Sequence, residues 1–240
     1  MWPTLLKLGP LTLNSYGLMI AIGFLTALHF IQKETSKQSI DPDVINTAAF
    51  WSLLLGITGT RVLHILMFPS DYSWSDPIGW FAIWKGGLVF QGGPPPVMVF
   101  LYFYLRKKKV PFLKVVDIAG VYLPLAHAIG RLGCFFKGCC YGKLTNAAWA
   151  MSFPRWPRDI GLPAEDSPAY LDHFSEGLVE RTDLWSSPVH PTQIYESVGL
   201  LCVTVLLLFL RKKWHPFDGI VLPSYLALYG VLRFLSLIHI

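Results

Sequence analysis

Two arginines stand in apolar stretches of this chain, where a charged side chain is costly: Arg131 and Arg233. Ionisable residues inside a membrane are rare and tend to mark binding sites or pathways, so each is a candidate for function. A guanidinium group presents a planar fork of donors that can hold a phosphate through two parallel hydrogen bonds. Two such forks near one face of a membrane predict a site for an anionic group.

For other ionisable side chains in apolar stretches, a structural explanation competes with a functional one. Arg61 and His64 share one stretch, and Asp117 and His127 share another. A buried ion pair between helices would explain Asp117 or His64 as well as a ligand site would. The sequence leaves both alternatives open.

Glycine-rich segments and the two arginines lie at the same ends of the apolar stretches. The distribution of Lys and Arg predicts that these ends face the outer side of a membrane. Residues 86–93 contain four glycines, Gly130 precedes Arg131, and Tyr16 opens the first stretch. Glycine allows a backbone and a ligand to approach closely. Together with the positive charge of Arg131, these glycines favour an anionic lipid head group as the ligand. Small residues also mark close packing between membrane helices, and this alternative stays open for Gly86 and Gly87.

Three of the four cysteines fall in one short segment, as Cys134, Cys139 and Cys140. Such a group could hold a metal, form a disulfide or present a reactive thiol. Zinc sites of known spacing have a second Cys or His pair nearby, which is missing here. We therefore expect packed or oxidised thiols, no bound metal and no cofactor. Cys202 lies among Leu and Val and is expected to be a small apolar residue.

The composition indicates the elements that must position these residues. Hydrophobic residues make up 53% of the 240 residues and charged residues 15%, which excludes an ordinary soluble domain, a disordered tail and a basic nucleic-acid-binding domain. A membrane-spanning helix needs about 20 apolar residues. Hydropathy predicts an all-α membrane protein, a multi-span helical bundle. The triple proline at residues 94–96 should break or kink the third span near its outer end. The predicted spans cover residues 11–31, 44–68, 86–105, 112–129, 193–210 and 220–240.

Basic residues concentrate in alternate connections between these spans. Lys33 and Lys37 follow the first span, residues 106–114 follow the third, and residues 211–213 follow the fifth. Because cytoplasmic loops carry the excess of Lys and Arg, the N-terminus is predicted to lie outside. The long segment between the fourth and fifth spans, residues 133–191, is rich in Pro, Gly and Trp and shows no helical period. It is predicted to form a small irregular or β-containing head on the outer side. The predicted domains are a membrane bundle over 1–131, a head over 132–190, and two further spans over 191–240.

Five short runs occur in order along the chain: SYGLM, WKGGLVFQGG, GRLGCFFKGCCYG, HPTQIYE and LYGVLRF. Together they resemble the bacterial prolipoprotein diacylglyceryl transferases over nearly the whole chain. The resemblance implies a multi-span enzyme of the bacterial inner (plasma) membrane, with its N-terminus and head on the periplasmic side. It implies transfer of a diacylglyceryl group from phosphatidylglycerol to the lipobox cysteine thiol of a prolipoprotein, with release of glycerol phosphate. Its partners would be this membrane lipid and the prolipoprotein, with no nucleic acid.

Individual residues carry over by motif. Arg131 and Arg233 would bind the phosphate or stabilise charge on the leaving glycerol phosphate, because preorganised cations at a developing anion contribute strongly to catalysis. Gly142 closes the signature run that contains Arg131, and Tyr229 shares the YGxxR run with Arg233. The resemblance implies catalytic roles for Arg131, Arg233, Gln91 and Tyr16, and substrate binding by Arg131, Gly142, Tyr229, Gly92, Cys134 and Cys139.

Three positions depart from the family pattern. Gln91 stands where the family has a His, and an amide can orient a group but cannot accept a proton near neutral pH. Cys134 and Cys139 replace an Asn and a Glu, so the chain resembles a divergent branch. An alternative function is a catalytically altered relative that binds anionic phospholipid or modifies another nucleophile. A transporter or channel is disfavoured because the charges cluster at one face.

The C-terminal residues form a further departure. The family has an acidic residue four positions after the equivalent of Arg233, followed by a seventh span, but this chain has Leu237 and ends at Ile240. Residues 235–240 read as the translation of a transposase end sequence used in sequencing libraries. We expect the seventh span to be missing and residues 235–240 to be an artefact.

Overall fold

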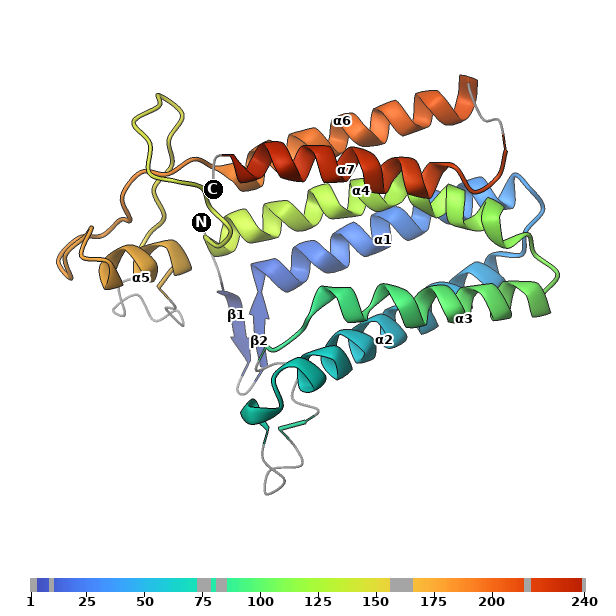
Figure 1. Ribbon diagram of the computed structural model, residues 1–240, viewed down its shortest axis with the longest axis horizontal. Coiled ribbons are helices and arrows are strands. Elements are labelled where there is room, and N and C mark those ends of the chain that lie inside the picture. Colours follow the sequence, from blue (N-terminus) through green and yellow to red (C-terminus); the bar gives the residue numbers. More distant parts are fainter. Residues whose placement is uncertain are drawn as a thin grey trace. The chain divides into compact units, whose positions relative to one another are not determined.

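The computed structural model describes residues 4–8, 11–72, 79–80, 86–155, 166–213 and 217–238. Within these ranges the main elements are helices, and four of them are long and apolar enough to cross a membrane (Figure 1). This confirms an all-α, multi-pass membrane protein, whereas the count of six spans stays a prediction. Residues 156–165 of the predicted head and 239–240 of the predicted artefact lie outside the described residues. The four long helices are α1 (Ser15–Ser36), α2 (Pro42–Met67), α4 (Phe112–Lys137) and α6 (Thr192–Lys213).

The chain divides into two compact units. The first contains residues 1–31 and 116–240, and the second contains residues 32–115. The boundaries predicted at residues 131 and 190 stay predictions, although α4 continues as far as Lys137.

The chain begins with a β-hairpin instead of entering the first span directly. Strand β1 (Thr4–Leu8) pairs antiparallel with β2 (Leu11–Asn14), with Leu8 opposite Leu11 (Figure 1). The first helix therefore begins at Ser15, and the span predicted from residue 11 is corrected at this end. A short segment such as residues 11–13, with leucines at both ends, suits a strand as well as a helix, and pairing with β1 decides between them.

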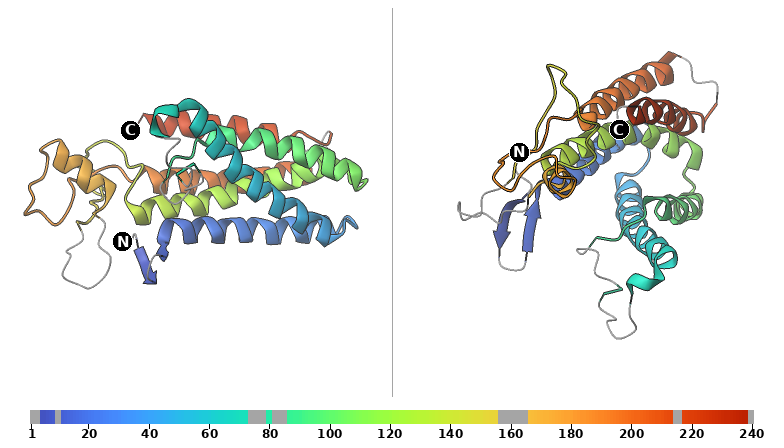
Figure 2. Two further views of the ribbon diagram at one scale, coloured as in Figure 1. Left: turned by 90° about the horizontal axis from the view of Figure 1, so that it is seen from below. Right: turned by 60° about the vertical axis from the view of Figure 1, so that its left-hand side comes forward.

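Helices α1, α4, α6 and α7 (Val221–Leu237) enclose the core of the first unit, and Figure 2 shows α6 and α7 side by side. Helices α1 and α4 approach closely, because a Cβ on Gly23 would lie only 2.8 Å from the carbonyl oxygen of Ala126. Near the start of α4, the carboxylate of Asp117 accepts hydrogen bonds from the backbone N–H groups of Gly219, at 2.6 Å, and Val221, at 2.9 Å. Val221 is the first residue of α7. A carboxylate at a helix N-terminus stabilises that helix, which favours the structural explanation for Asp117.

The second unit packs α2 against α3 (Pro94–Lys107). The third span was predicted from residue 86, but its helix begins at Pro94, after an irregular segment and the 3-10 turn Phe90–Gly92. The triple proline thus starts the helix and does not break it, which corrects the prediction. The first turn of a helix has no intrahelical partner for its N–H groups, so proline loses nothing there.

Arg61 has a structural role in the second unit. Its guanidinium group donates to four backbone carbonyls, at Gly79 (2.6 Å), Trp80 (3.0 Å), Gly86 (2.7 Å) and Gly87 (3.0 Å). A Cβ on Gly87 would lie 2.7 Å from Arg61 Nη1, and Gly87 has a φ of +73°. Both observations require glycine at residue 87, so this glycine allows the backbone of residues 86 and 87 to approach Arg61 closely.

The described part of the predicted head is built around buried side chains. Phe153 and Val189 have no exposed surface, and isolated β-bridges join Met151 to Val189 and Leu144 to Val189. Helix α5 (Pro168–Ser175) forms although the sequence showed no helical period here. The Ser167 hydroxyl caps this helix by accepting the Tyr170 N–H at 3.3 Å.

Candidate active site

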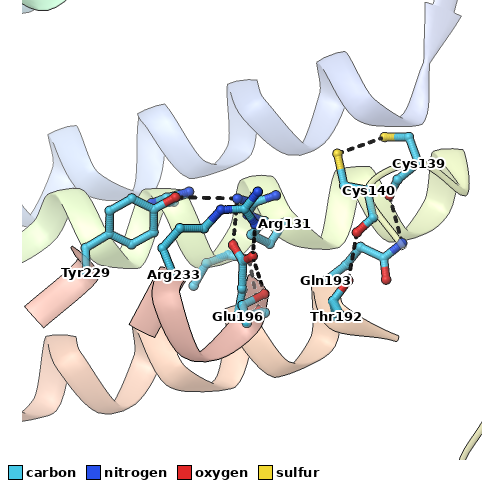
Figure 3. Close-up of polar contacts among 12 residues, drawn as sticks. Arg131, Cys139, Cys140, Thr192, Gln193, Glu196, Tyr229 and Arg233 are labelled. Carbon is cyan, nitrogen blue, oxygen red and sulfur yellow. Dashed lines mark hydrogen bonds and ion pairs between the residues drawn. The ribbon is translucent and has the colours of Figure 1, made fainter. Parts of the chain in front are cut away.

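Three helices of the first unit bring two arginines onto one carboxylate. Figure 3 shows the guanidinium groups of Arg131, from α4, and Arg233, from α7, converging on Glu196, from α6. Arg131 Nη2 lies 2.6 Å from Glu196 Oε2, and Arg233 Nη1 pairs with Glu196 Oε1. The Ser236 hydroxyl of α7 also donates to Oε1, at 2.7 Å. Arg131 and Arg233 are the charged partners of Glu196 among the described residues, and these three side chains form the cluster.

Burial makes the cluster electrostatically strong. Glu196 is 1% exposed, whereas the side chains of Arg131 and Arg233 are 14% and 35% exposed. Two positive charges face one negative charge, so the cluster keeps a net positive charge in surroundings where water screens poorly. The buried Nε of Arg131 has no hydrogen-bond partner among the described residues. The site therefore has both a charge and a donor to offer an anionic ligand.

Aromatic side chains line the cluster. Arg131 Nη2 donates to the hydroxyl oxygen of Tyr229 at 3.5 Å. The rings of His127 and Tyr229 lie 4.8 Å apart, and His127 Nδ1 lies 3.1 Å from the hydroxyl oxygen of Tyr225. Tyr229 and Arg233 are four residues apart on α7 and so share one face of that helix. This spacing explains how the YGxxR run presents both side chains to the same place.

The start of α6 holds the turn that follows α4. The Thr192 hydroxyl donates to the carbonyl oxygen of Cys140 at 2.8 Å, and Gln193 Nε2 donates to that of Cys139 at 2.7 Å (Figure 3). Both Thr192 and Gln193 are fully buried. Hydrogen bonds from Cys134 and Cys139 lower the pKa of the Cys140 thiol, and the positive charge of Arg131 acts in the same direction.

Tyr16 and Gly142 also lie in the first unit. Tyr16 opens α1 beside α4, where a Cβ on Gly133 would lie 3.2 Å from the Tyr16 Cα atom. Lys137 Nζ lies 6.0 Å from the centre of the Tyr16 ring, within the range of a cation–π contact. The N–H of Gly142 donates to the carbonyl oxygen of His190 at 2.9 Å, which ties the end of the signature run to the segment before α6.

Gln91 and Gly92 belong to the second unit, in the turn before α3. The Gln91 side chain is exposed. A Cβ on Gly92 would collide with the backbone of Gly59 on α2, so close packing of α2 against this turn accounts for that glycine. Their assignment to the active site stays a prediction.

Glu196 ends the HPTQIYE run but was assigned no role at the site from the sequence. It is the only acidic residue in the predicted fifth span, so the criterion that selected Arg131 and Arg233 also applies to it. Thr192 and Gln193 lie in the HPTQIYE run but received no role of their own, because a polar residue at the start of a span is commonplace.

The chain is similar to known proteins over nearly its whole length. The family model described as prolipoprotein diacylglyceryl transferase matches residues 3–237. A phosphatidylglycerol–prolipoprotein diacylglyceryl transferase of Burkholderia ambifaria is 32% identical, over 97% of this chain and 80% of its own length. Proteins of the same description from Neisseria meningitidis and Ralstonia pickettii are 29% and 32% identical, over 82% and 79% of their own lengths and 98% and 97% of this chain.

Proposed function

The chain belongs to the prolipoprotein diacylglyceryl transferase family, and we propose that it moves a diacylglyceryl group from phosphatidylglycerol to a cysteine thiol of a prolipoprotein. The cluster of Arg131, Glu196 and Arg233 is the observation that carries this proposal. It combines a net positive charge with guanidinium forks, which suit the phosphate of an anionic lipid.

The chemistry of the transfer explains why two arginines are useful. The thiolate sulfur attacks the glyceryl carbon that carries the phosphate, so a C–S bond forms while the C–O bond to the phosphate breaks. The electron pair leaves on glycerol phosphate, whose phosphate gains a second negative charge. Arg131 and Arg233 stabilise that developing charge, and Glu196 holds both guanidinium groups in place before it appears.

The incoming thiol must lose its proton before it attacks. Gln91 cannot accept this proton near neutral pH. A thiol with a pKa of about 8.5 is about 3% ionised at pH 7, which costs about 2 kcal/mol. A positively charged site lowers that cost by favouring the thiolate, so transfer can proceed without a dedicated base.

The remaining assignments follow from the same proposal. The acceptor is the lipobox cysteine, and the enzyme lies in the bacterial inner membrane with its N-terminus and the head on the periplasmic side. The basic connections after α1, α3 and α6 support this orientation, since they would all face the cytoplasm. Tyr229, Tyr16, Gly142, Cys134 and Cys139 line the site or shape the turn beside it.

Rescue of a bacterial strain depleted of its own transferase tests the proposal. The chain and an Arg181→Ala control, altered at an exposed arginine of the head, should both restore growth and lipoprotein modification, whereas Arg131→Ala should not. Membrane insertion of each variant is verified by fractionation. Rescue by Arg131→Ala, or failure of the correctly inserted chain, would contradict the proposal.

The glutamine at residue 91 favours one alternative, a relative that binds anionic phospholipid without efficient transfer. In that case the purified chain binds phosphatidylglycerol but transfers slowly, and Gln91→His raises the rate of transfer. If Gln91→His leaves the rate unchanged in an active chain, the missing histidine does not limit this enzyme.

A further inference from the structure

Three thiols of the first unit form a compact group at the end of α4. The Sγ atoms of Cys134, Cys139 and Cys140 all lie within 4.8 Å of one another, and those of Cys139 and Cys140 are 3.9 Å apart. The spacing of the cysteines along the chain predicted no bound metal, but that spacing does not show how close their sulfur atoms lie. From this proximity we propose that the trio binds a single thiophilic cation, Cu(I), held by three thiolates. The site lies beside the arginine cluster in sequence and structure, but its ligand is unrelated to the lipid phosphate.

The spacing of the sulfur atoms suits one shared ion. With metal–sulfur bonds of about 2.3 Å, three sulfurs in a trigonal plane around an ion are about 4.0 Å apart. Cys139 and Cys140 are already at this separation, at 3.9 Å. Because no pair is more than 4.8 Å apart, the widest separation needs to shorten by less than about 1 Å, which rotation of side chains can supply.

The backbone holds the three thiols together without any ion. The N–H of Cys139 donates to the carbonyl oxygen of Cys134 at 3.1 Å, which folds the turn back onto the last turn of α4. Thr192 and Gln193 fasten the carbonyl groups of Cys140 and Cys139 from α6. Cys140 has a φ of +60°, which is unfavourable for a residue with a Cβ and persists only where its surroundings impose it. The ligands are therefore preorganised.

The number and type of ligands favour Cu(I) over Zn(II). Among the residues that the structure describes, no histidine or carboxylate joins the three thiols, whereas structural zinc sites have four ligands. Thiolates are soft ligands, which suit Cu(I). Three thiolates and one Cu(I) carry two negative charges in total. Arg131 and Lys137, three residues before and after Cys134 on α4, place positive charges on the same side of the helix to offset them.

The three cysteines also offer a route for the ion. Cys134 is buried, Cys139 is partly exposed and Cys140 is exposed. An ion can thus be captured by Cys140 and passed inward to the other two thiols. Binding requires the three thiols to lose their protons, so affinity should rise with pH.

Anaerobic titration of the purified chain with Cu(I), in competition with a chromophoric Cu(I) chelator, tests the proposal. We expect one Cu(I) per chain, and X-ray absorption should show about three sulfur neighbours at about 2.3 Å. Cys140→Ser and Cys139→Ser should each weaken binding at least about tenfold, since each removes a ligand. Cys202→Ser, a cysteine on the exposed side of α6, is the matched control and should bind Cu(I) as the parent chain does.

Thermal unfolding of each ion-free variant shows whether it is folded, and Cys140→Ser is the decisive variant because its side chain is exposed. Unchanged Cu(I) affinity in Cys140→Ser, or an equal loss in Cys202→Ser, would overturn the proposal. So would displacement of Cu(I) by an equal concentration of Zn(II), which would indicate a four-coordinate site. None of these measurements depends on transferase activity.

Discussion

Replacing Glu196 by Gln keeps the size of the side chain and removes the negative charge between the two arginines. Breaking a buried ion pair by removing one partner costs about 3–5 kcal/mol, because the other partner keeps its charge without compensation. The Arg233 side chain is 35% exposed, so water can replace part of its lost contact, whereas the Arg131 side chain is only 14% exposed. We therefore expect a loss near the lower limit, about 3 kcal/mol, mostly from Arg131.

The same substitution should separate binding from catalysis. A loss of about 3 kcal/mol lowers the midpoint of thermal unfolding by about 6–12 °C in a chain of this length. The net charge of the cluster rises, so the KM for phosphatidylglycerol should stay constant or fall. The guanidinium groups lose the carboxylate that positions them, and kcat should fall about 100-fold, as expected for catalytic groups displaced by about 1 Å.

Purified protein in detergent micelles allows both measurements. Thermal unfolding gives the change in stability, and mass spectrometry of a lipobox peptide monitors the transfer. Glu176→Gln, at an exposed position after α5, is the matched control, and Glu196→Asp should recover part of kcat because it retains the charge. The reasoning is wrong if Glu196→Gln unfolds within about 2 °C of the control, a shift of less than about 1 kcal/mol. It is also wrong if kcat and KM match those of the control.

Three further predictions concern the Arg131 fork, the packing around Gly92 and the buried His173. Arg131→Lys keeps the charge but loses the planar fork, so kcat/KM in the peptide assay should fall about 100- to 1,000-fold, and an unchanged value would exclude bidentate binding. Gly92→Ala should lower the free energy of unfolding by about 1–3 kcal/mol in thermal melts, because its Cβ meets the Gly59 backbone. Gly17→Ala, which has open space, is the control and should be neutral or stabilising. Burial lowers the pKa of His173, so the unfolded state binds a proton at a higher pH than the folded head does. The free energy of unfolding of the head should therefore be highest above about pH 6.5 and fall at lower pH. Hydrogen exchange from pH 7 to 5 should show this loss, and His173→Gln should remove it.

Several boundaries could not be predicted from hydropathy, for reasons visible in single elements. Leu11 and Leu13 are apolar and residues 11–13 belong to the predicted first span, yet they pair with β1. The triple proline looked like a break inside a span, but the same residues suit the first turn of α3. In both cases the composition fits two local structures, and contacts with another segment select one of them.

The long apolar runs are enough to identify this chain as a helical membrane protein, because such runs are stable in lipid only when their backbone groups pair internally. The order of its five motif runs also identified the family. Only the tertiary structure showed that Glu196 lies between Arg131 and Arg233, and that Cys134 joins Cys139 and Cys140 in one group. Such contacts depend on how each helix is rotated and shifted against its neighbours. Uniformly apolar helices do not encode that rotation in their hydrophobicity, so packing between side chains decides it.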